Sequence, residues 1–327
     1  MYPAPSPLAQ ARALDHPNPS PMAEPAVPWH AEALWQQLQP LLPGLSVEVV
    51  RSTSSTNSAL LERARVRPDA DAETDASVIV RRSVESAAFG RRASDWQPCL
   101  LVAEQQSAGR GRQGRGWHSQ AGASLTFSLG VGVAASEWSG LSLAIGVALC
   151  EALDPAAARP AANARPRLLL KWPNDLWLVD APAGSPGRKL GGILIETVTA
   201  GAQRLAIIGV GLNVRNFEVQ HANTGFAAMQ ELDPGATAPS VLAQVALPLA
   251  QAVKQFEREG FAAFAARFEE RDLLRGLRVR TTHPGVREGV ARGVSAQGAL
   301  LVETVDGLMP VSSGEVSVRL DAPATAA

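Results

Sequence analysis

The segment GRGRQGRGW, Gly109–Trp117, determines how the fold and function of this chain are interpreted. It holds three arginines and four glycines in eight residues, and a tryptophan follows them. The flanking segments CLLVAEQQ (99–106) and ASLTFSLGVGV (123–133) are apolar and predict two buried strands. Glycine lets the backbone approach a ligand and move, and arginine supplies a permanently charged, planar donor group. The pattern therefore predicts a mobile loop between core strands that closes on an anionic ligand.

Three other interpretations of this segment lead to different proteins. Gly109, Gly111 and Gly114 match the G-x-G-x-x-G spacing of dinucleotide-binding turns, but that motif needs a helix at its last glycine, and the residues that follow predict loop and strand. Arginine–glycine tracts that bind RNA normally lie in low-complexity sequence rather than between core strands. A surface hairpin with solvated arginines would leave the spacing of the arginines and Trp117 without a role.

Composition favours a soluble protein with a large core and two domains. The 327 residues are 46% hydrophobic and carry a formal net charge of −1, whereas a general nucleic-acid binder usually has a basic excess. Cys99 and Cys150 lie in apolar segments and are expected to be buried free thiols. No signal peptide and no apolar run of membrane-spanning length is present, so we expect a cytoplasmic protein without membrane association.

The sequence pattern divides the chain into four parts. Residues 1–28 are rich in proline, alanine and serine and predict a disordered tail. Residues 29–275 alternate helix and strand patterns and predict an α/β domain. Five short β segments separated by turn signals predict a small β-barrel domain over 276–320, and 321–327 form a second tail.

Two features inside the α/β domain carry specific expectations. Residues 66–97 form a charged insertion with one expected strand at Ser77–Val80. The first helix, in WHAEALWQQLQPLL (29–42), is expected to place three leucines on one face: Leu34, Leu38 and Leu41.

Four further motifs place polar groups beside apolar segments. KWPND (171–175) ends a buried strand with a cation, an amide and a carboxylate, and RKLGGILIE (188–196) places a lysine before a double glycine. GVGLNV (209–214) contains two strand glycines that leave room for a ligand against the backbone, and STN (55–57) offers hydroxyl and amide groups. Each motif alone also fits a simpler role, such as a proline turn, a charged strand end or a helix N-cap.

Together and in this order, these motifs resemble those of the biotin–protein ligases, also called biotin–[acetyl-CoA-carboxylase] ligases. The resemblance rests on STN, QQSAGRGRQGRGW, KWPNDL, RKLGGILIE and GVGLNV, and on EGVARGVSAQGALLVETVDGLMPVSSGEVSVR near the C-terminus. It covers roughly Trp29 to Leu320. It implies an α+β fold: a catalytic domain with a mixed β-sheet, like that of class II aminoacyl-tRNA synthetases, followed by a small SH3-like β-barrel.

The resemblance also implies a two-step reaction that uses biotin, ATP and Mg²⁺. Biotin's carboxylate attacks the α-phosphorus of ATP to give biotinyl-5′-AMP. A specific lysine of the biotin carboxyl carrier protein of acetyl-CoA carboxylase then takes the biotinyl group. Because an anion must approach a polyanion, we expect the site to act mainly by positioning groups and stabilising charge.

Residue roles carry over by motif position. One implied set binds biotin: Ser55, Thr56, Asn57, Gln106, Arg110, Gly111, Arg112, Lys189, Gly192, Leu194 and Gly209. A second, overlapping set binds ATP: Arg112, Arg115, Trp117, Lys171, Asn174, Asp175, Lys189, Asn213 and Phe226. The implied catalytic cations are Lys189, Arg112 and Lys171. Asp175 is the candidate Mg²⁺ ligand, with positioning of the incoming lysine as its alternative role.

Two alternative functions and one question of assembly are left open by the sequence. The alternatives are a lipoate or octanoate transferase of the same superfamily and a non-enzymatic nucleic-acid-binding protein that uses the arginine–glycine segment. The stretch before STN is too short for the N-terminal DNA-binding domain of some relatives, so we expect no DNA binding. The segment Arg167–Trp172 is a candidate edge for a homodimer.

Overall fold

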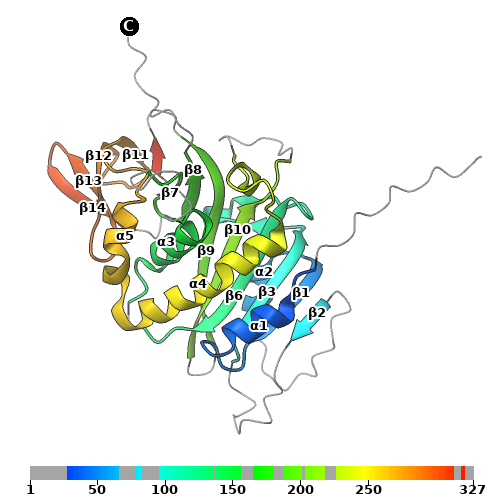
Figure 1. Cartoon of the computed structure of the whole chain (residues 1–327). Coiled ribbons are helices and arrows are strands. Elements are labelled where there is room, and N and C mark those ends of the chain that lie inside the picture. The colour runs from blue at the N-terminus through cyan, green and yellow to red at the C-terminus, as the bar shows by residue number, and fades with distance from the viewer. Residues whose placement is uncertain are drawn as a thin grey trace, which may run out of the picture.

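The computed structural model describes nine stretches of the chain: residues 28–65, 78–82, 96–135, 137–155, 165–179, 187–200, 203–217, 226–312 and 318–320. They form an eight-stranded mixed sheet, a five-stranded antiparallel sheet and a two-stranded hairpin (Figure 1). Most of the 66–97 insertion and almost all of the two expected tails lie outside the described residues. Within the insertion, β2 (Val78–Arg82) forms close to the expected strand at Ser77–Val80.

The large sheet has the order β2-β1-β3-β6-β10-β9-β8-β7. All neighbouring strands are antiparallel except β1 and β3, which are parallel. The middle strands are almost wholly buried because both faces of the sheet are covered there, which explains their long apolar runs. The remaining bounds are β1 Ser46–Thr53, β3 Cys99–Gln106, β6 Ser124–Gly132, β7 Leu168–Lys171, β8 Asp175–Leu178, β9 Arg188–Ala200 and β10 Gln203–Asn213.

Three helices cover one face of this sheet: α1 (Ala31–Leu38), α3 (Leu141–Leu153) and α4 (Ala238–Glu259) (Figure 1). α1 buries Leu34 and Leu38 as expected. The expectation for Leu41 is wrong in detail, because α1 ends at Leu38 and the turn that follows buries Leu42 and leaves Leu41 half-buried.

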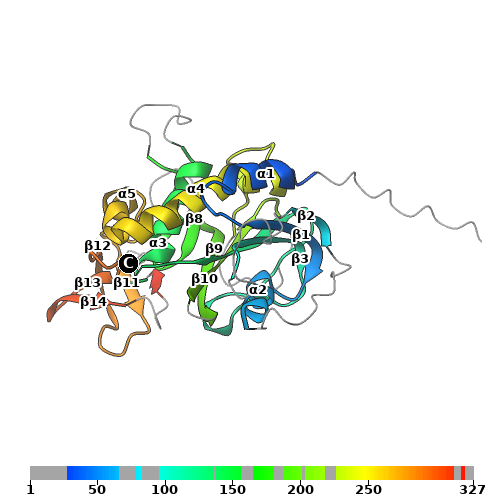
Figure 2. The same ribbon diagram turned by 90° about the horizontal axis from the view of Figure 1, so that it is seen from below.

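The opposite face carries α2 (Thr56–Arg65), as Figure 2 shows. Ser55 caps this helix: the backbone N–H of Ser58 donates to Ser55 Oγ at 3.4 Å, as expected for an N-cap serine. α2 packs its Leu60 and Leu61 against Leu101 and Ile207 in a small separate core. Because α2 covers only part of this face, the sheet surface beside its N-terminus is left for the site described below.

The second sheet follows α5 (Ala265–Glu269) and has the order β14-β13-β12-β11-β15. Its five strands occupy the five β segments expected after residue 276: β11 Arg278–Thr281, β12 Glu288–Val294, β13 Leu300–Thr304, β14 Gly307–Val311 and β15 Val318–Leu320. Its buried side chains, such as Val279 and Val302, belong to the same apolar cluster as those of the large sheet. The indole N–H of Trp172, just after β7, donates to Gly298 O at 3.0 Å in the turn between β12 and β13.

The outer edge of β7 is already hydrogen-bonded within the chain. The N–H of Leu170 donates to Arg271 O at 2.7 Å, and Leu170 O accepts from the N–H of Leu273 at 3.0 Å. Leu168 is held likewise by the side chains of Asp154 and Arg271. The candidate dimer edge at Arg167–Trp172 is therefore not free for main-chain pairing with a second copy.

Both cysteines are buried free thiols, as expected. Burial raises the pKa of Cys150 to about 12. A search of the described helices finds none with the length and apolar character needed to span a membrane.

A buried carboxylate beside β7 makes stability depend on pH. Asp272 Oδ1 accepts from the N–H of Leu274 at 2.9 Å, whereas its buried Oδ2 has no hydrogen-bond partner among the described residues. Burial raises the pKa of Asp272 from 3.8 to about 6. The folded state therefore binds more protons than the unfolded state between these values, and the free energy of unfolding should fall as pH rises through this window.

We expect Asp272→Asn to remove this dependence, since the amide matches the neutral carboxyl and keeps the acceptor for Leu274. The free energy of unfolding of the variant should equal that of the parent near pH 4 and exceed it by on the order of 2–3 kcal/mol at neutral pH. Urea unfolding measured across this range tests the expectation. An equal difference at every pH would contradict it.

Candidate active site

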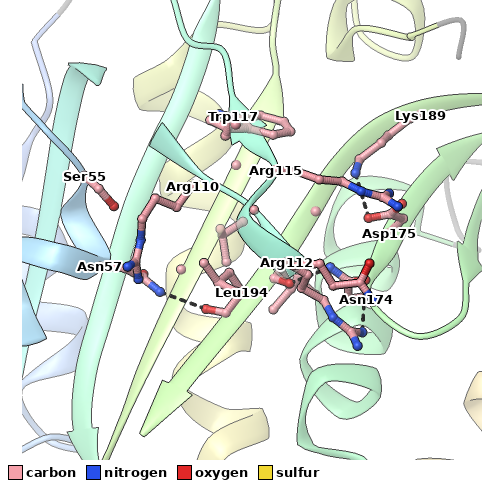
Figure 3. Close-up of a pocket in the computed structure, with 18 of the residues that line it drawn as sticks. Ser55, Asn57, Arg110, Arg112, Arg115, Trp117, Asn174, Asp175, Lys189 and Leu194 are labelled. Atoms are coloured by element: carbon pink, nitrogen blue, oxygen red, sulfur yellow. Dashed lines mark hydrogen bonds and ion pairs between the residues drawn. The ribbon is translucent and has the colours of Figure 1, made fainter. Parts of the chain in front are cut away.

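A pocket lies on the α2 face of the large sheet, beneath the segment Gly109–Trp117 (Figure 3). That segment forms a hairpin: β4 (Gly109–Arg110) pairs antiparallel with β5 (Gly116–Trp117). The turn between them places Gln113 and Gly114 in the left-handed region, at φ 56° and 70°. The hairpin interpretation of the segment is thus correct for its backbone, but its three arginines line the pocket.

Glycines form the floor of the pocket because side chains from other elements rest directly on the sheet. A Cβ on Gly209 would lie 2.2 Å from Asn57 Oδ1, and one on Gly211 would lie 2.5 Å from the Trp117 ring. Both glycines belong to β10, two residues apart, and therefore face the same side. Trp117 Nε1 is buried without a hydrogen-bond partner among the described residues.

Hydroxyl and amide side chains line one end of the pocket, next to the ion pair between Arg110 and Glu196. Behind this lining, the buried Ser128 Oγ lies 2.7 Å from Thr56 Oγ1 and 2.6 Å from Asn57 Oδ1. Gln106 Oε1 accepts from the N–H of Thr56 at 2.7 Å. This end therefore presents fixed donors and acceptors in a largely buried environment, which suits a neutral ligand with several N–H and C=O groups.

Cationic side chains gather at the other end (Figure 3). Lys189 Nζ contacts Asp175 Oδ1 at 2.8 Å, and Arg112 Nη1 donates to Asn174 Oδ1 at 3.4 Å. Lys171 Nζ lies 4.5 Å from the centre of the Trp177 ring. Burial lowers the pKa of Arg112, with Asp175 acting to raise it and Arg115 to lower it further. A guanidinium that has lost part of its hydration is a strong partner for an anion.

The structure brings together all but two of the residues that the resemblance implied. Asn213 and Phe226 are outside the pocket lining. Asn213 is buried and its side-chain amide donates to Ala227 O at 3.1 Å, while the Phe226 ring lies 5.7 Å from that of Phe217. The side chain of Asn213 therefore holds the segment next to Phe226 instead of lining the pocket.

The pocket also contains residues that the sequence did not single out: Gln113, Gly116, Phe127, Trp172, Pro173, Ile193 and Val210. Gly211, the second strand glycine expected to leave room for a ligand, lines the pocket with Gly209. The Trp172–Pro173 peptide bond is cis. Lys171 and Asn174, on either side of this pair, both line the pocket. Nothing in the sequence indicated Ser128, because its partners Thr56 and Asn57 are distant in the chain.

Within the described residues, no group of three or more histidine, cysteine, aspartate or glutamate side chains forms a candidate metal site. Asp175 and Asn174 are nevertheless adjacent at the cationic end of the pocket. A hard cation that is bound mainly by substrate phosphates needs only one or two such protein oxygens.

Comparison with known proteins agrees with this geometry. Residues 88–213 match the Biotin/lipoate A/B protein ligase family, and residues 276–319 match the Biotin protein ligase C terminal domain. The chain is 33% identical over 298 residues to the biotin--[acetyl-CoA-carboxylase] ligase of Mycobacterium tuberculosis, covering 86% of this chain and 89% of that protein. It is also 33% identical over 293 residues to the bifunctional ligase/repressor BirA of Escherichia coli, covering 87% and 77%.

A solved structure supports the same relationship. The biotin protein ligase of Aquifex aeolicus in complex with biotin and ATP superposes with a TM-score of 0.63 and 26% identity, covering 84% of this chain and 99% of that one. The chain therefore belongs to the biotin/lipoate A/B protein ligase family. Within this family, its relatives place it among the biotin protein ligases.

The close contact at Gly209 gives a test of the pocket floor. Gly209→Ala should push the Asn57 side chain away from β10 and break its hydrogen bonds with Ser128 and Leu194. We expect this to lower the free energy of unfolding by about 1–3 kcal/mol. Gly132→Ala is the matched control, since its Cβ would meet its nearest neighbour at 3.9 Å. Urea unfolding of both variants tests this, and equal stability of the two would contradict the proposed contact.

Proposed function

We propose that this pocket joins biotin to ATP and then passes the biotinyl group to a protein lysine. One observation carries the proposal: a polar, uncharged end and a cationic end meet in a single pocket under an arginine-bearing hairpin. Biotin has a neutral ureido ring at one end and a carboxylate at the other, which matches this division. ATP supplies the phosphates that the cationic end would neutralise.

The uncharged end suits the ureido ring. Ser55, Thr56, Asn57 and Gln106 supply hydroxyl and amide groups, and the backbone of Arg110 and Gly111 lies above them in the hairpin. Gly192, Leu194 and Gly209 line the slot between the two ends, where the apolar part of biotin would lie. The carboxylate then points toward Arg112 and Lys189.

In the first step, negative charge moves from the biotin carboxylate to the departing pyrophosphate, and the cationic end has to neutralise it. A carboxylate oxygen of biotin attacks the α-phosphorus, the bond to the bridging oxygen breaks, and pyrophosphate leaves with the electron pair. Lys189 and Arg112 are the proposed contacts for the carboxylate and the α-phosphate, and Arg115 and Lys171 for the other phosphates. Asp175 holds Lys189 beforehand, so this cation is oriented without ligand.

Asp175 and Asn174 are the proposed protein contacts of a Mg²⁺ ion, directly or through water. They fit because one carboxylate and one amide oxygen lie beside the phosphate-binding cations. Held there, such an ion would neutralise part of the phosphate charge and so reduce its repulsion of the incoming carboxylate. Trp117 is the proposed platform for adenine, with Asn213 and Phe226 at its edge; their contact with ATP requires a shift, since neither lines the pocket.

In the second step, the amine of an acceptor lysine attacks the acyl carbon and AMP leaves. We propose the biotin carboxyl carrier protein of acetyl-CoA carboxylase as this acceptor, because the relative from M. tuberculosis is named biotin--[acetyl-CoA-carboxylase] ligase. Asp175 also lies where it could position the incoming amine. The hairpin excludes water from the adenylate, which would otherwise hydrolyse.

The two alternative functions find less support. The buried Cys150, with its raised pKa, is a poor thiolate nucleophile, and Cys99 is buried as well, so a cysteine-dependent acyl transferase does not fit. The arginines of the hairpin line one pocket rather than an extended strip that could follow a nucleic-acid backbone.

We propose that the catalytic domain spans 29–275 and is of the class II aminoacyl-tRNA synthetase type, and that 276–320 form an SH3-like barrel. The mixed sheet and the five antiparallel strands support this assignment. A homodimer, if formed, would use a surface other than the β7 edge, which the chain itself covers. The cytoplasmic location and the lack of DNA binding stay predictions.

Biotin-dependent exchange of pyrophosphate into ATP tests the function in purified protein with Mg²⁺. Lys189→Ala should lower the exchange rate by about 10²–10³-fold, because it removes a preorganised donor to the developing charge. Lys254→Ala is a matched control: both lysine side chains are 31% exposed and lie 2.8 Å from a carboxylate. Absence of exchange in the parent protein would reject the function.

Arg112→Gly should weaken retention of the intermediate, since it opens the hairpin side of the cationic end. We expect faster release of radiolabelled biotinyl-5′-AMP than from the parent. Arg112→Lys keeps the charge but not the planar guanidinium, so its rate of release should lie between those of the parent and Arg112→Gly. An unchanged release rate in Arg112→Gly would show that Arg112 does not retain the intermediate.

A further inference from the structure

Glu196 lies just outside the pocket lining but connects two of its walls. It is on β9, on the same face of the sheet as Gly192 and Leu194. Its Oε2 forms an ion pair with Arg110 of the hairpin and accepts from Asn57 Nδ2 at 2.9 Å. Its side chain is 27% exposed. One carboxylate oxygen therefore contacts both the hairpin, through Arg110, and the start of α2, through Asn57.

The contact with Asn57 determines which way its amide points. Asn57 Nδ2 donates to Leu194 O at 3.1 Å and to Glu196 Oε2, so both amide hydrogens are used. Its Oδ1 is left facing Ser128 Oγ above Gly209. A flipped amide would place Oδ1 against the Glu196 carboxylate and a carbonyl, which is unfavourable because all three are acceptors. Glu196 and Leu194 O thus both hold the Asn57 amide with its oxygen toward Ser128.

The contact with Arg110 holds the hairpin across the pocket. Arg110 is the last residue of β4, and its guanidinium extends to β9, an element distant in sequence. At the tip, the bond from Arg112 to Asn174 is long, at 3.4 Å. The charge-assisted contact with Glu196 is therefore the stronger of these two ties between the hairpin and the sheet.

We propose that Glu196 is a positioning residue that couples closure of the hairpin to orientation of Asn57, and so holds the hydroxyl-and-amide end of the pocket in its binding arrangement. An isolated surface ion pair would contribute little. Here the same oxygen also accepts from a buried amide, so losing the carboxylate releases Arg110 and leaves one N–H of Asn57 without its acceptor. The proposal deepens the function above and rests on it for the identity of the ligand.

Glu196→Ala should raise the KM for biotin by about tenfold, with little change in the KM for ATP and a smaller change in kcat. It should also speed tryptic cleavage after Arg110, Arg112 and Arg115 in the protein without ligand, because the hairpin is no longer tied down. The proteolysis result does not depend on any catalytic activity.

Two further variants separate the contacts. Glu196→Gln keeps an oxygen acceptor for Asn57 but loses the charge that holds Arg110, so the biotin KM should recover in part while tryptic cleavage stays fast. The double variant Arg110→Ala with Glu196→Ala should have no higher KM for biotin than Glu196→Ala alone, since Arg110 acts on biotin binding only through its contact with Glu196. Glu151→Ala is the matched control: its carboxylate pairs with Arg267 at similar exposure but away from the pocket.

The results distinguish a failure of this inference from a failure of the proposed function. If the parent protein catalyses biotin-dependent exchange and Glu196→Ala has unchanged biotin KM and unchanged proteolysis, the inference is wrong and the function stands. An equal rise in both KM values together with a lower Tm would assign Glu196 to general stability and overturn the inference. If the parent shows no exchange, the function fails, and cleavage of the hairpin still decides whether Glu196 holds it.

Discussion

Direct contact between side chains and bare main chain on β10 determines the geometry of this site. Asn57 rests on Gly209 and Trp117 on Gly211, at distances that a methyl group would not permit. The N-terminus of α2 and the base of the hairpin can therefore approach the sheet together. The pocket exists because these two elements meet the sheet side by side without side chains between them.

The rest of the fold keeps this face of the sheet open. α1, α3 and α4 cover the opposite face with a continuous apolar core that extends into the C-terminal sheet. Stability therefore comes mainly from the face without the site, and the pocket face can hold polar groups. Trp172 links the pocket to the C-terminal sheet, since it lines the pocket and its indole N–H donates to Gly298 O, between β12 and β13.

The charges of the site are arranged in pairs that a ligand can rearrange. Lys189 is held by Asp175 and Arg110 by Glu196, whereas Arg112 has lost part of its hydration. Cations that are partly neutralised within the protein can coexist in a small pocket, and an incoming polyanion competes for them. The same property explains why a chain with a net charge near zero can bind a phosphate-rich ligand.

The sequence by itself determined the motifs, the strands and most of the site, because apolar periodicity and clustered glycines and arginines are local features. It indicated β3 and β6 around the hairpin, the five C-terminal strands and a helix cap in the STN motif. Only the tertiary structure decided that Asn213 turns inward, that segment 271–273 covers the β7 edge, and that Glu196 meets Arg110 and Asn57. These outcomes depend on contacts between residues far apart in the chain, and no local pattern encodes which side chains the folded sheet brings together.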